Sequence, residues 1–345
     1  MKNGKVTLRW PLIGNEHITE FLSRSLSSGA VGGAYIFTGP DSLGKTTAAL
    51  YFARSLLCQG KGNKLPCLTC PACNQFKNQT DIDAESVHGD FSFVKRAEDK
   101  KNISIEQIRD LIRILNMSSF LDSYKIGIIK GADSLSLEAA NALLKTLEEP
   151  KKKVIIILIA ANPENLPATI ASRSRILNFK LVETDMIYDY LIKKYKVGRS
   201  QAKHLSRLSA GRPALAVKFW EDKEFYEEYL NRAKVFLNFF SQDLNQRLSS
   251  LDNLFGKRIS AQEARQETGL ILEIWQSLTR DFLLLEWEQN FLTRHEVLLD
   301  ELEKIKPKIR KDIALNLVDK LEQARAYLGA NVTPKLVLED LACAL

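Results

Sequence analysis

The sequence predicts an α/β fold, a parallel sheet with flanking helices, that is followed by an all-helical region. Short apolar strands alternate with helical patterns over about the first 180 residues, which is typical of a parallel sheet. One of these strands leads directly into the glycine-rich stretch GPDSLGKTT, and a helical pattern follows it. Beyond this region the strand pattern ends and amphipathic helical stretches take its place.

The expected elements follow one another in a regular order. A helix is expected at His17–Ser27, and further helices begin after Ser104 and Ser136. Ser104 and Gln107 have the spacing of a capping box, which closes a helix N-terminus. Apolar strands are expected at Ala34–Phe37, Phe91–Val94, Lys125–Ile129 and Val154–Ile159. The longest apolar run, 154–161, suits a buried parallel strand.

Composition and charge narrow the class of protein. With 345 residues, 45% of them hydrophobic and 26% charged, the chain is long enough for two or three domains of an ordinary soluble protein. The apolar run is too short to cross a membrane, and the N-terminus has no secretion signal, so we expect a cytoplasmic protein without a membrane partner. The net charge of +7 permits contact with nucleic acid, but the basic residues are spread out, which favours a generally solvated surface.

Three domains are expected from these patterns. Residues 1–180 form the α/β domain, with a cysteine-rich module inserted at 58–73. Residues 181–223 are interpreted as a small helical lid, which includes a helix–turn–helix in LSAGRPALAVKFW. Residues 224–345 are interpreted as a helical C-terminal domain.

The glycine-rich stretch fits the phosphate-binding loop G-x-x-x-x-G-K-[ST] at every position. Gly39 and Gly44 allow a tight backbone whose N–H groups would face phosphates at a helix N-terminus. Lys45 would reach the β- and γ-phosphates, Thr46 would ligate Mg²⁺, and Thr47 completes the set. A chance match in a glycine turn is the alternative, which the strand–loop–helix setting disfavours. ATP or ADP with Mg²⁺ is therefore an expected ligand.

Hydrolysis would require an acidic pair, and the sequence lacks it at the expected place. One acid holds Mg²⁺ at the end of a second strand, and the next polarises the attacking water. Here the apolar stretch 126–129 is followed by Lys130 and Gly131. Asp133 lies beyond the strand and reaches the site only if the loop curves back. The sequence therefore predicts a nucleotide-binding fold without turnover.

Four of the five cysteines stand close together in the pattern C-x8-C-x2-C-x2-C. They are Cys58, Cys67, Cys70 and Cys73. In a chain without a secretion signal such a cluster favours metal over disulfides, and four thiolates satisfy a tetrahedral structural Zn²⁺. Four buried free thiols are the alternative. Cys343 stands alone and is expected to pack as a small apolar residue.

The order of these motifs resembles the clamp-loader branch of the AAA+ ATPases, the bacterial DNA polymerase III subunits. AANALLKTLEEP, residues 139–150, is similar to the signature of that branch. LPATIASRSRIL is similar to the segment with a Ser-Arg-Cys motif, here Ser172, Arg173 and Ser174. The resemblance covers nearly the whole chain. It implies an AAA+ P-loop domain, a helical lid and a helical collar that joins subunits.

Two types of clamp-loader subunit compete as the nearest match. Catalytic gamma/tau subunits keep the acidic pair and a threonine after the next strand, whereas this chain has Lys130, Gly131 and Ala160. The delta-prime subunit resembles gamma but does not hydrolyse ATP, and the chain is identified as similar to that type. The resemblance then implies a hetero-pentameric ring with gamma/tau and delta subunits, which loads the sliding clamp at primed DNA.

The resemblance also implies roles for two arginines. Arg173 would be an arginine finger on ATP held by a neighbouring gamma/tau subunit; a surface arginine paired with a carboxylate is the alternative. Arg212, in AGRPALA, is similar to a lid arginine that touches phosphate, and a plain helix-start arginine is the alternative. In the collar, an apolar face with Trp275, Phe282 and Trp287 suits core or interface, and core is favoured for each.

Three functions remain open at this point. A non-catalytic ring subunit, or stator, is favoured by the gap at Lys130 and Gly131 together with Arg173. An active ATPase of the gamma/tau type would recruit Asp133 as a metal ligand and lose its turnover in Lys45→Ala. A zinc-dependent DNA-binding module would bind DNA tightly by itself, with an affinity that falls steeply with salt.

Overall fold

The computed structural model of the protein describes residues 7–60, 64–75, 89–97, 100–119, 123–254, 260–309 and 311–344. The chain divides into an N-terminal unit, residues 1–183, and a C-terminal unit, residues 184–345. The division falls near residue 180, where the sequence predicts the end of the α/β layer. Among the described helices, none is long and apolar enough to cross a membrane.

A five-stranded parallel sheet forms the centre of the N-terminal unit, as far as the chain is described. The strand order is β4-β5-β6-β2-β7. The strands are β2 (Ala34–Thr38), β4 (Phe91–Lys95), β5 (Lys125–Lys130), β6 (Val154–Ile159) and β7 (Arg175–Asn178). β2 pairs on both sides, with Tyr35 opposite Ile157 of β6 and Arg175 of β7. The predicted α/β fold and its four expected strands are confirmed.

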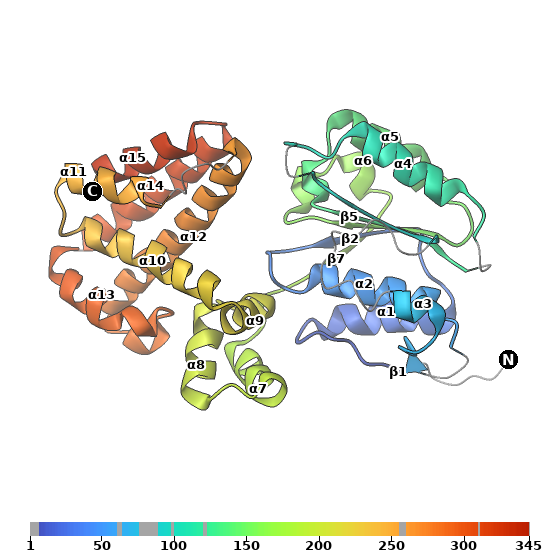
Figure 1. Ribbon diagram of the computed structural model, residues 1–345, viewed down its shortest axis with the longest axis horizontal. Helices are drawn as coiled ribbons and strands as arrows, with labels where there is room; N and C mark the ends of the chain where they lie inside the picture. The colour runs from blue at the N-terminus through green and yellow to red at the C-terminus, as the bar shows by residue number, and fades with distance from the viewer. Residues whose placement is uncertain are drawn as a thin grey trace. The chain divides into compact units, whose positions relative to one another are not determined.

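Helices cover both faces of the sheet (Figure 1). One face carries α1 (Glu16–Ser28) and α2 (Lys45–Leu57); the other carries α4 (Ile105–Asn116), α5 (Leu137–Glu148) and α6 (Ala168–Ala171). Alternate strand residues serve the two layers, since Phe37 packs with α1 and α2 while Ile36 packs with α4 and α5. β6 is buried along its whole length because both of its faces are covered.

β7 is a strand that the sequence did not predict. It forms one edge of the sheet, and Arg175, Ile176 and Asn178 are exposed. The stretch RILN is too polar for a buried-strand pattern, and its place depends on pairing with β2. The Arg175 guanidinium lies 5.4 Å from the centre of the Phe21 ring of α1, a cation–π contact that fastens this edge.

Helix starts follow the local sequence closely. The predicted capping box is confirmed: Ser104 Oγ accepts from the Gln107 backbone N–H at 3.4 Å, and Gln107 Oε1 accepts from the Ser104 N–H at 3.1 Å. Ser136 Oγ caps α5 in the same way, through the backbone N–H of Ala139 at 3.1 Å. These contacts satisfy N–H groups that have no partner within the helix.

The cysteine-rich segment is attached to the N-terminal unit by three contacts. A short strand β1 (Thr7–Leu8) pairs in parallel with β3 (Lys64–Leu65). The Tyr51 hydroxyl of α2 donates to the Leu65 carbonyl at 3.4 Å. Arg54 of α2 donates to the Cys73 carbonyl in α3 (Pro71–Gln75) at 2.8 Å. The segment is therefore held against α2.

The C-terminal unit is helical in its described part. Its α-helices are α7 (Thr184–Tyr195), α8 (Arg199–Leu208), α9 (Pro213–Glu221), α10 (Lys223–Phe239), α11 (Leu244–Asp252), α12 (Ala261–Glu286), α13 (Leu299–Ile305), α14 (Lys311–Gly329) and α15 (Pro334–Ala344). The predicted helix–turn–helix corresponds to α8 and α9. The expected boundary between a lid (181–223) and a collar (224–345) stays a prediction.

An aromatic cluster lies at the core of this unit. The Trp275 ring of α12 is fully buried and stacks on Phe236 of α10, with ring centres 4.9 Å apart. Phe282 is also buried, whereas Trp287 is 52% exposed. The expectation of core packing is therefore confirmed for Trp275 and Phe282 and is wrong for Trp287, because α12 ends at Glu286 and the chain turns there.

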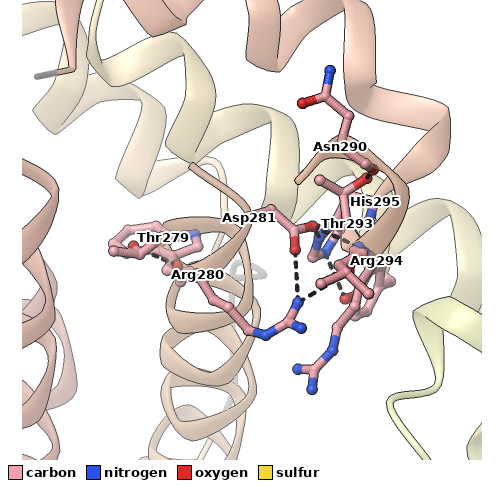
Figure 2. A network of polar contacts seen from close by, with 10 residues as sticks. Thr279, Arg280, Asp281, Asn290, Thr293, Arg294 and His295 are labelled. Atoms are coloured by element: carbon pink, nitrogen blue, oxygen red, sulfur yellow. Dashed lines mark hydrogen bonds and ion pairs between the residues drawn. The ribbon is translucent and has the colours of Figure 1, made fainter. Parts of the chain in front are cut away.

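A buried polar network joins α12, α10 and the segment before α13 (Figure 2). Asp281 is 0% exposed, and its Oδ2 accepts from the backbone N–H groups of Arg294 (3.0 Å) and His295 (2.9 Å) and from His295 Nδ1 (2.8 Å). Its Oδ1 lies 3.1 Å from Arg280 Nη1. Because a carboxylate only accepts, His295 Nδ1 is the donor to Asp281, and the other ring nitrogen, Nε2, lies 2.9 Å from the Tyr229 hydroxyl. Burial raises the pKa of Tyr229, so this hydroxyl stays protonated.

Candidate functional site

The phosphate-loop stretch lies between β2 and α2, at the carboxyl end of a strand with a neighbour on each side. Gly39 has a φ of +124°, and a Cβ there would lie 2.3 Å from the carbonyl oxygen of Phe179. Gly44, at the start of α2, has a φ of +88°, and its Cβ would meet Leu12 at 2.6 Å. Both positions therefore require glycine. The strand–loop–helix setting that the motif needs is present.

α2 begins without a side-chain cap, because Gly44 occupies the cap position. The first N–H groups of a helix have no acceptor within the helix, and the helix dipole favours a negative charge beside them. In this first turn Thr46 is half-buried and Thr47 is exposed. The loop thus has the backbone arrangement that a phosphate requires, while the roles of Thr46 and Thr47 stay predictions.

The Lys45 side chain folds back onto the loop and is 6% exposed. Its Nζ donates to the Gly39 carbonyl and to the Pro40 carbonyl at 2.8 Å, and lies 3.4 Å from Asp41 Oδ1. Burial lowers the pKa of this ammonium group, and the negative charges of Asp41 and Asp133 oppose the shift. A phosphate group would compete with these oxygens for the ammonium group.

The end of β5 carries the gap in the acidic motif. β5 is separated from β2 by β6, and it ends at Lys130, which is exposed. Gly131 follows with a φ of +73° and begins a single 3₁₀ turn, 132–134. This turn brings Asp133 close enough to Lys45 for its charge to act on the ammonium group. A role of Asp133 as a metal ligand stays a prediction.

The position expected to carry a threonine is Ala160, directly after β6. Ala160 is 1% exposed, and its backbone N–H donates to the Phe37 carbonyl at 3.0 Å. Its methyl group offers no polar contact to a phosphate or to water. The described ends of β5 and β6 thus carry Lys130, Gly131 and Ala160 at the positions that the sequence analysis compared with the gamma/tau motifs.

Arg173 follows α6, and its guanidinium is directed at its own chain. Nη2 lies 2.8 Å from Glu148 Oε1 at the end of α5. Nη1 donates to the Thr169 carbonyl at 3.0 Å and to Ser172 Oγ at 3.2 Å. Next to it, Ser174 Oγ is buried and has no hydrogen-bond partner among the described residues. The contacts of Arg173 match the plainer alternative, a surface arginine with a carboxylate partner, and its role as a finger stays a prediction.

Arg212 stands at the cap position of α9, as the plainer alternative for this residue expects. It forms an ion pair with Glu273 of α12, and its Nε donates to the Ser209 carbonyl at 3.3 Å. All three residues lie in the C-terminal unit. The expected contact of Arg212 with a phosphate stays a prediction, and it would require release from Glu273.

The four clustered cysteines converge on one point. The sulfurs of Cys58, Cys67, Cys70 and Cys73 all lie within 4.8 Å of one another. A tetrahedral zinc with Zn–S bonds of about 2.3 Å places its sulfurs about 3.8 Å apart, and the sulfurs of Cys67 and Cys73 are 4.0 Å apart. Backbone N–H groups point at three of the sulfurs, with N···S distances between 3.2 and 3.4 Å.

The surroundings of the cluster fit a zinc ion. Burial raises the pKa of the Cys58 thiol and raises that of Cys73 to about 12, so both need a nearby cation to remain thiolates. Gly60 leaves room beside the sulfurs, because a Cβ there would lie 3.1 Å from Cys67 Sγ and 3.4 Å from Cys58 Sγ. The four cysteines could therefore hold zinc, and the ion itself stays a prediction.

The chain has relatives among known proteins. Residues 14–183 match the family model described as "DNA polymerase III, delta subunit". Over 176 residues the chain is 35% identical to DNA polymerase III subunit tau of Bacillus subtilis, which covers 51% of this chain and 30% of that protein. Over 221 residues it is 32% identical to subunit delta' of the same organism, which covers 63% of this chain and 62% of that protein.

These matches show that the protein is similar to clamp-loader subunits of DNA polymerase III. The clamp-loader relatives of different type match at similar identity, 35% for tau and 32% for delta', so the match does not separate the types. The chain spans less than two thirds of the length of these relatives. Among solved structures, a gamma subunit-related protein of Thermotoga maritima is 16% identical, with a TM-score of 0.49, over 95% of this chain and 97% of that one.

Three carboxylates that the sequence analysis missed contact the predicted site residues. The pairs are Asp41 with Lys45, Glu148 with Arg173, and Glu273 with Arg212. Asp41 had a signal, because it precedes Lys45 by one helical turn inside the motif. Glu148 also had one, since it belongs to the quoted clamp-loader signature. Glu273 had no signal, because only the packing of α9 near α12 brings it to its partner.

Proposed function

We propose that this protein is a non-catalytic, delta-prime-type subunit of a bacterial DNA polymerase III clamp loader. It would act in the cytoplasm, in a hetero-pentameric ring with gamma/tau and delta subunits that loads the sliding clamp onto primed DNA. The observation that carries the proposal is the end of β5, where Lys130 and Gly131 occupy the positions of the acidic pair. The family match of the N-terminal unit supports the clamp-loader part.

Hydrolysis requires groups that this site does not provide. One carboxylate would hold Mg²⁺ and another group would orient the attacking water. Lys130 instead places a positive charge at the strand end, Gly131 has no side chain, and Ala160 contributes only a methyl group. The phosphate-binding half, with Gly44 and Lys45, is complete. We therefore expect ATP or ADP with Mg²⁺ to bind without turnover.

Arg173 is the residue that we expect to act on a partner's nucleotide. It lies in a partly exposed stretch after α6, with 36% of its side chain exposed. Its planar guanidinium presents several N–H donors in a geometry that matches phosphate oxygens. An arginine supplied in trans stabilises the charge of a transferring phosphoryl group and is worth about 10³ to 10⁵ in rate. The protein would thus complete the chemistry of a neighbour without having its own.

Zn²⁺ has a structural role in this proposal. The four cysteines would fill all positions of a tetrahedral ion, which leaves none for a substrate. The ion would keep the segment around 58–73 folded against α2, where Arg54 and the β1–β3 pair already hold it.

An active ATPase of the gamma/tau type is the second candidate, and one observation favours it. Asp133 lies in the 3₁₀ turn directly after β5, and its negative charge opposes the burial that lowers the pKa of the Lys45 ammonium group. This carboxylate could support Mg²⁺ binding in place of the missing acid. It is a single group, however, and it leaves the water without an acidic partner.

Steady-state ATP hydrolysis separates the two candidates. The purified chain would be assayed alone, and then with its gamma/tau and delta partners, sliding clamp and primed DNA. We expect no turnover alone, and an assembly-dependent turnover that falls by about 10³ or more in Arg173→Ala. The matched control is Arg24→Ala, an exposed arginine that pairs with Glu20 at 3.1 Å, which should leave the turnover unchanged.

The opposite result is equally clear. Turnover by the chain alone, abolished in Lys45→Ala and strongly reduced in Asp133→Asn, would establish the second candidate. Unchanged turnover of the assembly in Arg173→Ala would remove the finger from the first.

A further inference from the structure

The guanidinium of Arg173 is held on two sides by its own chain. Its Nη2 lies 2.8 Å from Glu148 Oε1, while Nη1 donates to the Thr169 carbonyl at 3.0 Å and to Ser172 Oγ at 3.2 Å. Both terminal nitrogens, the groups that a phosphate would need, are therefore engaged within the N-terminal unit. A finger that reaches a neighbour must first release at least one of them.

Glu148 occupies a position that helix stability does not favour for a carboxylate. It is the last residue of α5, where the backbone carbonyls concentrate negative charge, and an acidic side chain is unfavourable there. The Arg173 guanidinium compensates for this by contacting the carboxylate directly. The helix itself gains nothing from Glu148, so its partnership with Arg173 is the physical reason for an acid at this place.

The two anchors of Arg173 differ in how readily an incoming anion would replace them. Glu148 is 47% exposed and Arg173 is 36% exposed, so solvent screens the pair, and such pairs shift a population by a factor of about five at most. A nucleoside triphosphate carries several negative charges, which attract the Arg173 guanidinium and repel the Glu148 carboxylate. The acceptors of Nη1, the Thr169 carbonyl and Ser172 Oγ, are uncharged and lie within the same turn of the chain, so an incoming anion would not repel them.

We propose that Glu148 is a positioning residue that stows Arg173 in the free chain and yields it to a neighbour's phosphates on assembly. Nη2 leaves Glu148 for the phosphate, while the bonds of Nη1 to Thr169 and Ser172 keep the side chain in place. The inference rests on the proposed function, because it gives Arg173 a destination. The inference adds that Glu148 is the partner of Arg173 in the free chain, and that this ion pair opens when the ring assembles.

Chemical modification of Arg173 tests the stowed state without any partner protein. Phenylglyoxal reacts with guanidine groups that are accessible and not paired with a carboxylate, and peptide mass spectrometry reports the rate at Arg173. We expect the rate in the free chain to rise about five-fold in Glu148→Ala and to return toward the native rate in Glu148→Asp. Alanine suits a helix end without a charge conflict, so this variant should fold.

Glu149 provides the matched control. It is the next residue, it is also an exposed carboxylate, and Arg173 pairs with its neighbour instead. Glu149→Ala should leave the modification rate of Arg173 unchanged. An equal rise in both variants would mean that general negative charge protects Arg173, and no rise in Glu148→Ala would mean that the pair does not form; either result overturns the inference.

Hydrolysis by the assembled ring tests the release. If Glu148 only stows the finger, Glu148→Ala keeps the kcat of the assembly at or above the native value, by up to about five-fold. If Glu148 must stay on Arg173 during the reaction, kcat falls toward that of Arg173→Ala, and the inference is overturned. The failure of the proposed function looks different, since Arg173→Ala itself would then leave kcat unchanged.

Discussion

The cysteine cluster of the N-terminal unit and the Asp281 network of the C-terminal unit both gather polar groups from separate segments, but they are completed differently. At the cysteines, the side chains of Cys58 and its three partners point at one another, and burial opposes the charging of Cys58 and Cys73. At Asp281, the carboxylate accepts from the backbone and ring of His295 and pairs with Arg280. The cysteine cluster therefore suits a bound metal ion, whereas the hydrogen bonds of Asp281 are made by groups of the chain itself.

The phosphate loop follows the pattern of the cysteines. The N–H groups at the start of α2 have no side-chain cap, and the Lys45 ammonium group donates hydrogen bonds to carbonyl oxygens of its own loop. In the N-terminal unit these polar groups lie at the two ends of α2 and in the segment with α3, whereas those around Asp281 lie between helices of the C-terminal unit. The stability of the N-terminal unit should therefore respond to ligands, and that of the C-terminal unit to its own side chains.

The largest change in unfolding free energy is expected when Asp281 is removed from its buried polar network. Asp281→Ala leaves the His295 ring and two backbone N–H groups without their acceptor in a buried place, which costs about 3 to 5 kcal/mol of unfolding free energy. Hydrogen exchange, followed peptide by peptide, should show the loss in α12 and α13 and leave the strands of the sheet protected. Asp300→Ala, at an exposed position of α13, is the control and should stay within about 0.5 kcal/mol.

An Asp281→Ala protein with native protection in α12 would break the comparison, because the network would then contribute no more than a surface contact. Protection lost equally in both units would mean that they unfold as one.

Removal of metal should act on the other unit. One zinc per chain is expected by elemental analysis, and Cys70→Ser should abolish it while Cys343→Ser retains it, since Cys343 stands outside the cluster. A ligand at 100 times its dissociation constant stabilises by about 2.7 kcal/mol. A chelator should therefore lower the opening free energy that protects α2 and α3 from hydrogen exchange by a comparable amount. The exchange of α12 should stay unchanged. A metal-free protein with native exchange in α3 would argue for four free thiols.

How much of the structure could be predicted from the sequence depends on how local each pattern is. The capping box of Ser104 and Gln107, the buried run of β6 and the glycines of the phosphate loop are local patterns, and each was predictable because neighbouring residues determine it. The gap at Lys130 and Gly131 was equally visible, since it is a departure from a local motif.

What the sequence did not reveal depends on contacts between distant segments. β7 is polar because it lies at an edge, and only its register with β2 identifies it as a strand. The hydrogen bond between Asp281 and His295 requires the chain to turn back toward α12 after Trp287. No periodic pattern in the sequence predicts this turn. Glu148 was inside a quoted motif, yet its contact with Arg173 follows from the packing of α5 against the segment after α6.

A smaller effect is expected from acid, and it should again be confined to the C-terminal unit. Burial lowers the pKa of His204 in α8, with Glu296 opposing and His295 adding to the shift. The unfolded chain, with a histidine pKa of about 6.5, then binds more protons than the folded one, so stability falls as the pH drops below about 6.5. The slope from one such group is at most about 1.4 kcal/mol per pH unit.

Urea unfolding at a series of pH values between 5 and 8 measures this slope, and His204→Gln should reduce it. His17→Gln, an exposed histidine of the N-terminal unit, should leave it as it is. An unchanged slope in His204→Gln would assign the acid sensitivity to other groups.

The smallest effect is expected on the unfolding free energy when the buried hydroxyl of Ser174 is replaced. This hydroxyl belongs to neither the cysteine cluster nor the Asp281 network. Ser174 Oγ is buried without a hydrogen-bond partner among the described residues, and the clamp-loader motif that it resembles has cysteine at this place. A buried hydroxyl without a partner costs roughly 1 kcal/mol or more relative to a less polar group. Ser174→Cys should therefore raise the unfolding free energy by about 1 kcal/mol, and urea unfolding measures it.

Thr268→Val is the parallel test in the C-terminal unit, because Thr268 Oγ1 is buried without a partner in the same way. Equal gains would show that the cost belongs to the hydroxyl itself and is indifferent to the surrounding unit. A loss in Ser174→Cys alone would mean that the larger sulfur does not fit beside Arg173, so that space rather than polarity determines the residue there. In that case the smaller serine would suit the space available between α6 and β7.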